Sequence, residues 1–409
     1  MTAIPVDAGA GLRTSWGGWL VTRLTLAALL WPLFFLATNP LRLAFVADTF
    51  VPFAMGNLLL SALCSLVAIA WIDRIRFSVL DLAMLGALVL TALVTDWQAA
   101  STRNVFVDIL KPLAFTLTVV AIREFVEVDA LLGDGARKLR AVASALGWAT
   151  VAAVVASHLI SAFVVPLYPA YASVDSLLPL AWLASAGMGW ATLGYLAVLV
   201  ASGKRGVYLA ALVVAWASRR LWLRRPQALT LLAIAAVATI GLSAVQPEWI
   251  AGNVLKIQDP AGDVALQASG YRLAEIDGAL ATMSNPIDWL AGKGFGFSFE
   301  APGFVGAEGE DEAHRNLHFT PLSILVYYGL AFAVPFYGLM VTCTVRSVRM
   351  IRGGGAPAVV GAFFIGHLAF SFTEFSVFVY ATFAVSCGLV LAMSREHDHG
   401  RRKAPSQQE

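Results

Sequence analysis

The sequence predicts an all-α polytopic membrane protein of about 11–12 transmembrane helices, with one large extracytoplasmic loop that contains amphipathic helices. Three observations lead to this prediction. Hydrophobic residues make up 59% of the 409 residues and charged residues only 13%, whereas a soluble domain carries about 45–50% apolar and about 25% charged residues. The apolar residues gather in blocks that approach the length of about 20 residues needed to cross a bilayer. The one long stretch of mixed polarity lies at 247–318.

Composition also excludes several classes of protein. So many apolar residues cannot be buried inside a soluble body of this size, which excludes an ordinary cytosolic enzyme, a disordered chain and a disulfide-stapled secreted module. The net charge of +2 creates no field that would attract nucleic acid, so we expect no nucleic-acid partner. The cysteines fall in apolar runs without C-x-x-C spacing. We expect them to be small hydrophobic core residues, not disulfide or metal partners: Cys64, Cys343 and Cys387.

The apolar blocks divide the chain into membrane and loop parts. They lie at 18–38, 51–71, 78–95, 105–122, 141–165, 176–201, 207–222, 228–246, 319–344, 356–373 and 376–393. The first block is followed by Thr-Asn-Pro and not by a small-residue cleavage site, so it reads as a membrane anchor. We expect one integral domain, made of N-terminal transmembrane helices (1–246), a large periplasmic loop (247–318), C-terminal transmembrane helices (319–393) and a cytoplasmic tail (394–409).

Basic residues in the short loops predict the orientation, because Lys and Arg gather on the cytoplasmic side. Basic clusters occur at 74–76, 137–140, 219–225, 346–352 and 401–403. Facing all of them inward puts both chain ends inside, which requires an even number of crossings. A twelfth crossing results if block 176–201 is broken near 186–190. The alternative is that 141–201 makes one crossing and a re-entrant hairpin.

The large loop is acidic, so its few cations are informative: Lys256, Arg272, Lys293 and Arg315. A guanidinium can bind phosphate through two parallel hydrogen bonds, so a loop arginine can hold an anion. The alternative for Arg272 is a salt bridge to Glu275 or Asp277.

Several segments of this loop carry local signals. Residues 271–283 have helical apolar spacing and predict an amphipathic helix, which Asn285-Pro286 ends. The glycine run at 292–296 lacks the strand and helix of a nucleotide fingerprint, and we expect a tight turn on the bilayer surface. His318 lies directly before the next block. Imidazole exchanges protons near neutrality, so His318 can act as a base, or it is an interfacial histidine without a catalytic role.

The basic turn at 202–206 lies one membrane crossing before the cytoplasmic cluster at 219–225, which places it outside. It is therefore an exception to the rule that Lys and Arg gather on the cytoplasmic side. Short outer turns are poor in Lys and Arg, so Lys204 and Arg205 suggest that this turn has a functional role. The alternative is that this turn is cytoplasmic.

Ionisable residues within apolar blocks are costly and favour a functional role. They are Asp81, Asp108, Lys111, His158, His367 and Glu374. Asp108 and Lys111 share a helical face and are expected to pair, in a structural role. Glu374 is expected on the outer side, where it orients a histidine or binds sugar. The sequence shows no metal-ligand cluster, and His397-Asp398-His399 is expected to be solvated in the basic tail.

These motifs together, across about 200–345, resemble the O-antigen ligase and O-antigen polymerase superfamily of bacterial envelope enzymes. The turn at 202–206 is similar to the family's small-Ser-Arg-Gly turn. Arg272, Asn285-Pro286 and 292–296 are similar to its Arg…Asn-Pro…Gly-x-Gly-x-Phe loop, and His318 with Gly329 to its histidine motif. Two departures are Phe319, where the family usually has Asn, Ser or Gln, and Phe332, where it has a second glycine. They leave open whether Asn316 supplies the polar group or His314 is the counterpart.

The resemblance implies a metal-independent glycosyltransferase without a cofactor, multi-pass in the bacterial inner membrane, with its catalytic loop facing the periplasm. Such an enzyme transfers or polymerises glycan from a polyprenyl (undecaprenyl) diphosphate carrier onto an acceptor glycan or glycolipid, as in O-antigen, exopolysaccharide or capsule assembly. It implies His318, Arg272 and Arg205 as catalytic residues. The expected substrate-binding residues are Lys204, His314, Arg315, Asn316, Lys293 and Glu374.

Two other functions are open at this point. A transporter of ions or small solutes is suggested by Asp108, Lys111 and Glu374, although no inverted repeat or pair of broken helices is evident. A structural membrane scaffold would leave the pattern of Arg205, Arg272 and His318 unexplained.

Overall fold

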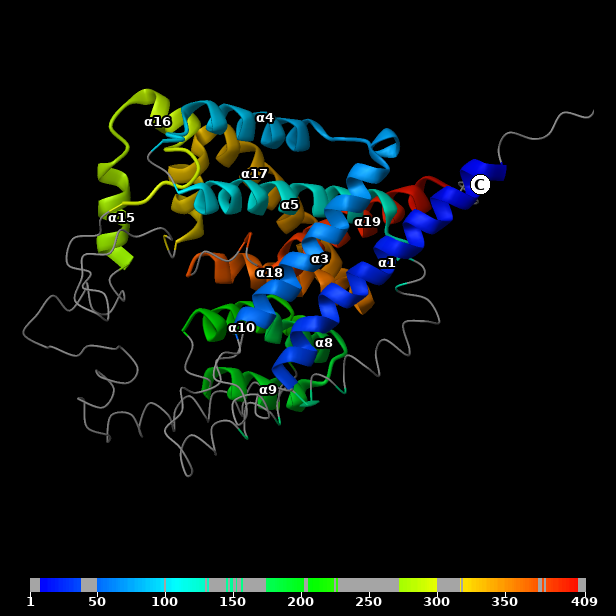
Figure 1. The fold of residues 1–409 in the computed structure, drawn as a ribbon. Helices are drawn as coiled ribbons and strands as arrows, with labels where there is room; N and C mark the ends of the chain where they lie inside the picture. The colour runs from blue at the N-terminus through cyan, green and yellow to red at the C-terminus, as the bar shows by residue number, and fades with distance from the viewer. Residues whose placement is uncertain are drawn as a thin grey trace, which may run out of the picture.

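The computed structural model describes residues 8–37, 50–98, 101–128, 131, 145, 148–149, 152, 156, 174–201, 205–223, 226, 272–299, 317, 319–373, 377–378 and 380–403. Every regular element in these ranges is a helix (Figure 1), which confirms the all-α class. The predicted block 228–246 and nearly all of 141–165 lie outside these ranges.

The helices follow the predicted blocks closely. The N-terminal part comprises α1 (Ala8–Ala37), α3 (Phe50–Ala70), the short 3-10 helix η1 (Ile72–Arg74), α4 (Val79–Val94) and α5 (Thr102–Phe125). The middle part comprises η2 (Val174–Ser176), α8 (Leu177–Ser185), α9 (Gly189–Ala201), α10 (Arg205–Ala217) and α11 (Arg219–Trp222). The C-terminal part comprises α15 (Arg272–Ala281), α16 (Pro286–Ala291), α17 (Thr320–Gly353), α18 (Gly355–Ser371) and α19 (Ala381–Lys403).

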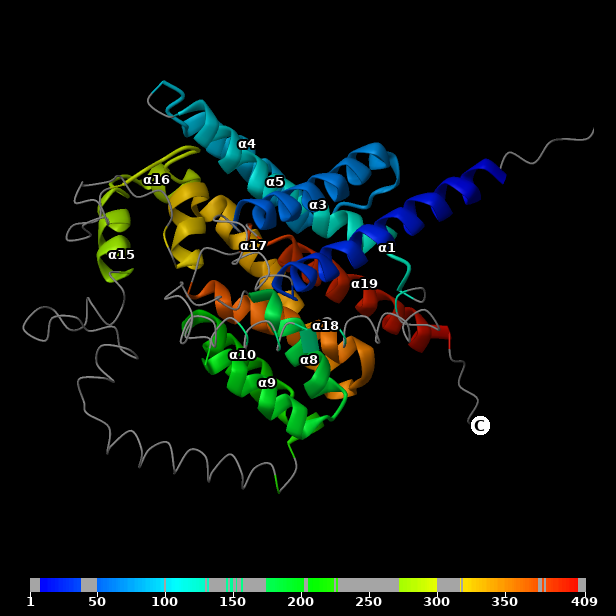
Figure 2. The same ribbon diagram turned by 60° about the horizontal axis from the view of Figure 1, so that its bottom comes forward.

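The break predicted near 186–190 is confirmed. α8 ends at Ser185 and α9 begins at Gly189, and between them Gly187 has φ +72°, a left-handed conformation that glycine adopts without steric cost. The amide of Met188 donates to the carbonyl of Leu183 at 3.0 Å and closes the end of α8. Figure 2 shows the resulting hairpin of α8 and α9 beside α10 and α18.

Two of the described helices, α5 and α17, are long and apolar enough to cross a membrane. Seven shorter apolar helices accompany them, at Gly56–Ala70, Val79–Val94, Val174–Ser185, Gly189–Leu199, Gly206–Ala217, Gly355–Ser371 and Ala381–Arg395. This composition fits a membrane-associated protein. The number of crossings and the domain boundaries stay predictions; α19 continues as one helix past residue 393, where the predicted tail begins.

α17 occupies the centre of the bundle and packs against α4, α16, α18 and α19 (Figure 1). Its buried face carries Phe332 and Phe336, whose stacked rings have centroids 6.0 Å apart. Phe115 of α5 packs against Phe336 at 5.6 Å. The cysteines are all free and buried, which confirms their prediction as core residues.

At the far end of α5 from the loop, Arg123 joins three segments. Its Nη1 lies 2.7 Å from the Asp81 carboxylate of α4, its Nε 2.8 Å from Glu124, and its Nη2 donates to the carbonyl of Arg76 at 2.7 Å. Arg395 of α19 reaches the same Glu124 carboxylate at 2.9 Å. Asp81 also caps α4, since it accepts from the amide of Ser78. The buried charge at Asp81 therefore has a structural role.

The amphipathic helix predicted at 271–283 is confirmed as α15, which packs on α17. Asn285 ends this segment and starts the next helix, because its side chain accepts from the amides of Ile287 and Asp288 at 2.9 and 3.0 Å. The Asp288 carboxylate in turn accepts from the amide of Asn285 at 3.3 Å and completes a capping box. Pro286 follows at the first helical position, where its missing N–H costs nothing.

Candidate functional site

The glycine run at 292–296 is joined to a break in α17. Gly329 has φ +68° and ψ −179° inside this helix. The break releases the carbonyls of Val326 and Tyr327 from their usual partners four residues later. They accept instead from the amides of Lys293, at 2.7 Å, and Gly294, at 3.3 Å.

Close packing explains why glycine is required at both contacting positions. A Cβ atom on Gly329 would collide with the carbonyl of Leu290, and one on Gly292 with the carbonyl of Tyr327. Both residues also have positive φ, +68° and +81°. Only glycine lets two backbones approach this closely in that conformation. The two glycines of the family-like pattern thus meet each other in space.

The same run is anchored on its other side by α4 and α5. The amide of Phe295 donates to the Thr95 hydroxyl at 3.0 Å, and the amide of Gly296 donates to the Asp108 carboxylate at 2.9 Å. Residues 292, 294 and 295 are buried. The turn predicted at 292–296 is present, but its expected place on the surface is wrong, because its amides find acceptors inside the bundle.

Asp108 therefore has a second partner beyond the one predicted from sequence. Its Oδ1 lies 3.9 Å from the ammonium of Lys111, which confirms the predicted pair. Its Oδ2 holds Gly296, and its backbone carbonyl accepts from the Tyr328 hydroxyl at 3.2 Å. Asp108 thus links α5 to the loop through its carboxylate and to α17 through its backbone carbonyl.

Lys293 is the one predicted site residue whose side chain the structure describes. Its ammonium lies 3.3 Å from Asp288 Oδ2 and 5.9 Å from the centroid of the Phe297 ring. Burial alone would raise the pKa of the Asp288 carboxyl. The hydrogen bond and charge of Lys293, with backbone hydrogen bonds from Ser284 and Asn285, outweigh burial and hold this pKa below its ordinary value. Lys293 therefore forms an ion pair with Asp288, which partly neutralises its positive charge.

The predicted arginines begin two helices at the same end of the bundle. Arg205 is the first residue of α10 and Arg272 the first of α15. Gly206 lies against Phe370 and Thr373 at the end of α18.

That end of α18 in turn meets the start of α17, because the Phe372 ring lies 6.1 Å from the ring of Phe319. α15 and α16 pack on α17, and Figures 1 and 2 both show them at this end. The three motif segments therefore lie at one end of the molecule, where the end of α18 contacts both the start of α10 and the start of α17.

The residue before His318 is held in place by packing and a hydrogen bond. Leu317 is buried, and its carbonyl accepts from the Ser323 hydroxyl at 2.7 Å. The predicted residues Lys204, His314, Arg315, Asn316, His318 and Glu374 lie outside the described residues, as do the side chains of Arg205 and Arg272. Their roles stay predictions.

A buried pair of ionisable residues lies between the helices. His367 of α18 is 1% exposed, and its Nε2 lies 4.0 Å from Asp175 Oδ1 of η2. The Thr382 hydroxyl of α19 donates to the same Asp175 oxygen at 2.5 Å. Sequence reasoning selected His367 and missed Asp175, which precedes an apolar block and carries no motif. His158 lies outside the described residues.

Among the described residues, no group of three His, Cys, Asp or Glu side chains could hold a metal ion. His397-Asp398-His399 falls within α19, with its side chains outside that description. No protein-family model matches the chain, and comparisons with curated proteins and with solved structures find no match either.

Proposed function

We propose that this protein is a glycosyltransferase that transfers or polymerises glycan from a polyprenyl diphosphate carrier onto an acceptor sugar hydroxyl. The observation that supports it most is the convergence of three separate motif segments at one end of the bundle. These are the start of α10, the α15–α16 segment with its glycine run, and the start of α17. The first and the last both contact the end of α18, and the α15–α16 segment packs on α17. A scaffold without a site would not require this convergence.

The proposed chemistry needs an anion clamp and a base. Arg205 and Arg272 hold the diphosphate and stabilise the charge that builds on it as it leaves. His318 accepts the proton of the acceptor hydroxyl while the new bond forms from the acceptor oxygen to the anomeric carbon. The bond from that carbon to the phosphate oxygen breaks, and the carrier leaves as a lipid diphosphate. Lys293 adds positive charge to this loop, and its ion pair with Asp288 offsets part of that charge.

The proposed location is the bacterial inner membrane, with both chain ends in the cytoplasm and the loop at 247–318 facing the periplasm. The acceptor is a second carrier-linked repeat for a polymerase, or a terminal sugar of a glycolipid for a ligase. Both reactions use the same carrier and the same leaving group.

Deleting the protein in cells and resolving the surface polysaccharide on a gel tests this function. Single repeats on the acceptor indicate a lost polymerase, and long chains stranded on the carrier indicate a lost ligase. Complementation with Arg205→Ala or Arg272→Ala should restore nothing, and Arg→Lys little, because a point charge does not replace a planar fork. Arg74→Ala, at an exposed pair with Asp73, should restore the wild-type profile. An unchanged profile on deletion would contradict the proposal.

A proton-linked transporter is the second candidate, favoured by the buried His367–Asp175 pair. Ionisable groups among apolar helices mark proton relays in pumps and transporters. Purified protein in liposomes with an imposed pH gradient would then move protons or solute, and His367→Ala would abolish the movement. The glycosyltransferase predicts no such movement and tolerance of His367→Ala in glycan transfer.

A further inference from the structure

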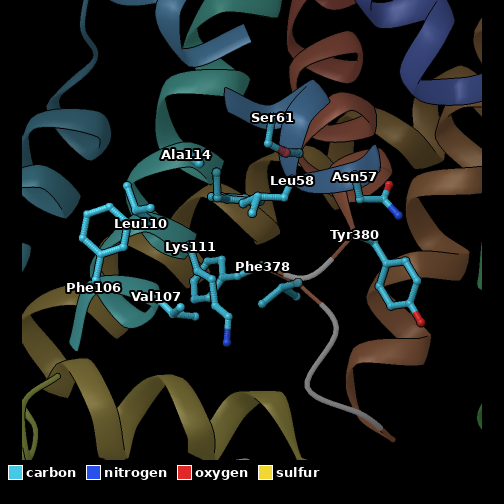
Figure 3. A pocket seen from close by; sticks show the side chains of 13 residues that line it. Asn57, Leu58, Ser61, Phe106, Val107, Leu110, Lys111, Ala114, Phe378 and Tyr380 are labelled. Carbon is cyan, nitrogen blue, oxygen red and sulfur yellow. The ribbon is translucent and has the colours of Figure 1, made fainter. Parts of the chain in front are cut away.

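A hollow of about 250 Å³ opens in the side of the bundle. It lies between α3, α5 and the residues that lead into α19, as Figure 3 shows. Apolar side chains form nearly all of its wall: Leu58, Phe106, Val107, Leu110, Ala114, Phe115, Val377, Phe378 and Ala384. The polar residues that line it are Asn57, Ser61, Lys111 and Tyr380.

The hollow is open to the outer face of the helices. Leu58 and Phe106 are 54% and 61% exposed at its rim, whereas Phe115 and Val377 are buried behind it. If the helices cross a bilayer, this opening faces lipid. A chain of hydrocarbon could then enter sideways from the membrane, without crossing water.

One side of the hollow is polar. In Figure 3 the ammonium of Lys111 and the hydroxyl of Tyr380 extend toward the same side. The Lys111 side chain is 23% exposed, and its ammonium forms an ion pair with Asp108 Oδ1 at 3.9 Å. An ammonium carries three donors, so Lys111 can bind a carboxylate and a phosphate together.

The polar side is also next to the candidate site. Asp108, the partner of Lys111, holds the amide of Gly296 with its other oxygen. Lys111 lines the hollow and Asp108 does not, so the hollow is connected to the glycine run through the Asp108–Lys111 pair of α5. A lipid whose chain fills the hollow would place its headgroup at Lys111, on the side of α5 that holds the glycine run.

We infer that this hollow binds the first isoprene units of the polyprenyl carrier and that Lys111 binds its phosphate. This inference rests on the proposed function. The apolar wall suits a hydrocarbon chain and the cation suits an anionic headgroup. The contacts of Asp108 with both Lys111 and Gly296 connect this headgroup position to the candidate site, which favours the carrier over an ordinary membrane lipid. The volume is slightly below the roughly 300–1,000 Å³ of drug-sized pockets, which fits part of one chain and not a whole lipid.

Binding of farnesyl phosphate to the purified full-length protein in detergent tests the inference. Ala114→Trp fills the hollow and should lower the affinity by about tenfold or more. If Ala114→Trp has a lowered melting temperature, Leu58→Trp, at the exposed rim, serves as a second variant that fills the hollow. The matched control is Ala369→Trp, which fills a second apolar hollow between α10 and α18 and should leave the affinity unchanged.

Two further measurements identify the ligand chemistry. Lys111→Met should weaken binding of farnesyl phosphate but not of farnesol, because only the phosphate needs the cation. Phosphatidylglycerol should compete poorly. If folded Ala114→Trp and Leu58→Trp both bind like wild type, or if phosphatidylglycerol competes as well as farnesyl phosphate, the inference is wrong.

Glycan transfer separates this inference from the proposed function. If the wild-type protein transfers glycan and the filled variants do so with the same KM for carrier, the hollow is not the chain site and the function stands. If the wild-type protein transfers no glycan, the proposed function fails whatever the hollow binds.

Discussion

The backbone amide of Lys293 donates a 2.7 Å hydrogen bond to the carbonyl of Val326, a residue in the first half of α17. This bond exists because α17 is interrupted at Gly329 and its carbonyls turn toward the loop. It fixes the position of the glycine run against α17. The segment that follows α15 and α16 is thereby joined to the helix that follows His318, and the contact between the Phe295 and Tyr328 rings, at 6.1 Å, adds to these backbone bonds.

Replacing either contacting glycine should therefore destabilise the protein. Gly329→Ala and Gly292→Ala combine positive φ with a collision against backbone, and strain of this kind costs about 1–3 kcal/mol per residue. Thermal melting of the purified protein measures the effect. Gly86→Ala and Gly194→Ala are the matched controls, because a Cβ there meets nothing within 4 Å, and helical alanine should stabilise each by about 0.5–1 kcal/mol. Equal melting temperatures of Gly329→Ala and Gly194→Ala would show that the close backbone contact between Gly292 and Gly329 does not stabilise the protein.

Asp108 should act through its hydrogen bond to Gly296. Asp108→Ala leaves that amide buried without its acceptor, at a cost of about 1–3 kcal/mol. Asp108→Asn keeps one acceptor oxygen and should lose less. Hydrogen exchange of the 292–299 segment should be faster in Asp108→Ala than in Asp108→Asn. Asp73→Ala, at a largely exposed carboxylate, should leave the segment unchanged; the same exchange rate in all three variants would refute this role.

Arg123 should be the most costly arginine to remove for stability. Arg123→Ala leaves the buried Asp81 carboxylate without its ion-pair partner, and breaking a buried pair in this way costs about 3–5 kcal/mol. A clear fall in melting temperature is expected. Arg74→Ala removes an exposed pair worth about 0–1 kcal/mol and should change little. Similar melting of the two variants would show that the Arg123 network does not stabilise the fold.

The Asp288–Lys293 pair should make the loop sensitive to acid. The pKa of Asp288 lies below its ordinary value in the folded protein, so the pair stabilises the loop above the unfolded pKa of about 3.9. That stabilisation is lost as pH falls through the lower, folded pKa. Lys293→Met should raise the pKa of Asp288, read from its carboxyl ¹³C shift, whereas Arg74→Met should not. If the titration midpoint of Asp288 does not change in Lys293→Met, the ion pair is not what lowers the pKa of Asp288.

Local signals made part of this structure predictable from sequence. Helical spacing marked α15, and Asn285-Pro286 marked its end. The three-residue spacing of Asp108 and Lys111 marked their contact. Each of these features is decided by residues within a few positions of one another.

The features that sequence missed depend on distant segments. The burial of 292–296 requires carbonyls that α17 releases at Gly329 and a carboxylate from α5, and no local pattern reports those acceptors. The same holds for Arg123 and Asp81, 42 positions apart in the chain, and for Asp175 and His367. Asp81 and His367 are recognisable as costly charges, but their partners become clear only after the helices pack.

The central claim is that Arg205 and Arg272 lie at the same, outer end of the bundle. Labelling Arg205→Cys and Arg272→Cys with a membrane-impermeant maleimide on intact spheroplasts tests it directly, against low background because all native cysteines are buried. Both variants should label from outside, whereas Arg349→Cys near the other end of α17 should label only after permeabilisation. If Arg205→Cys or Arg272→Cys also required permeabilisation, the two arginines could not share one diphosphate, and the proposed enzyme would be wrong.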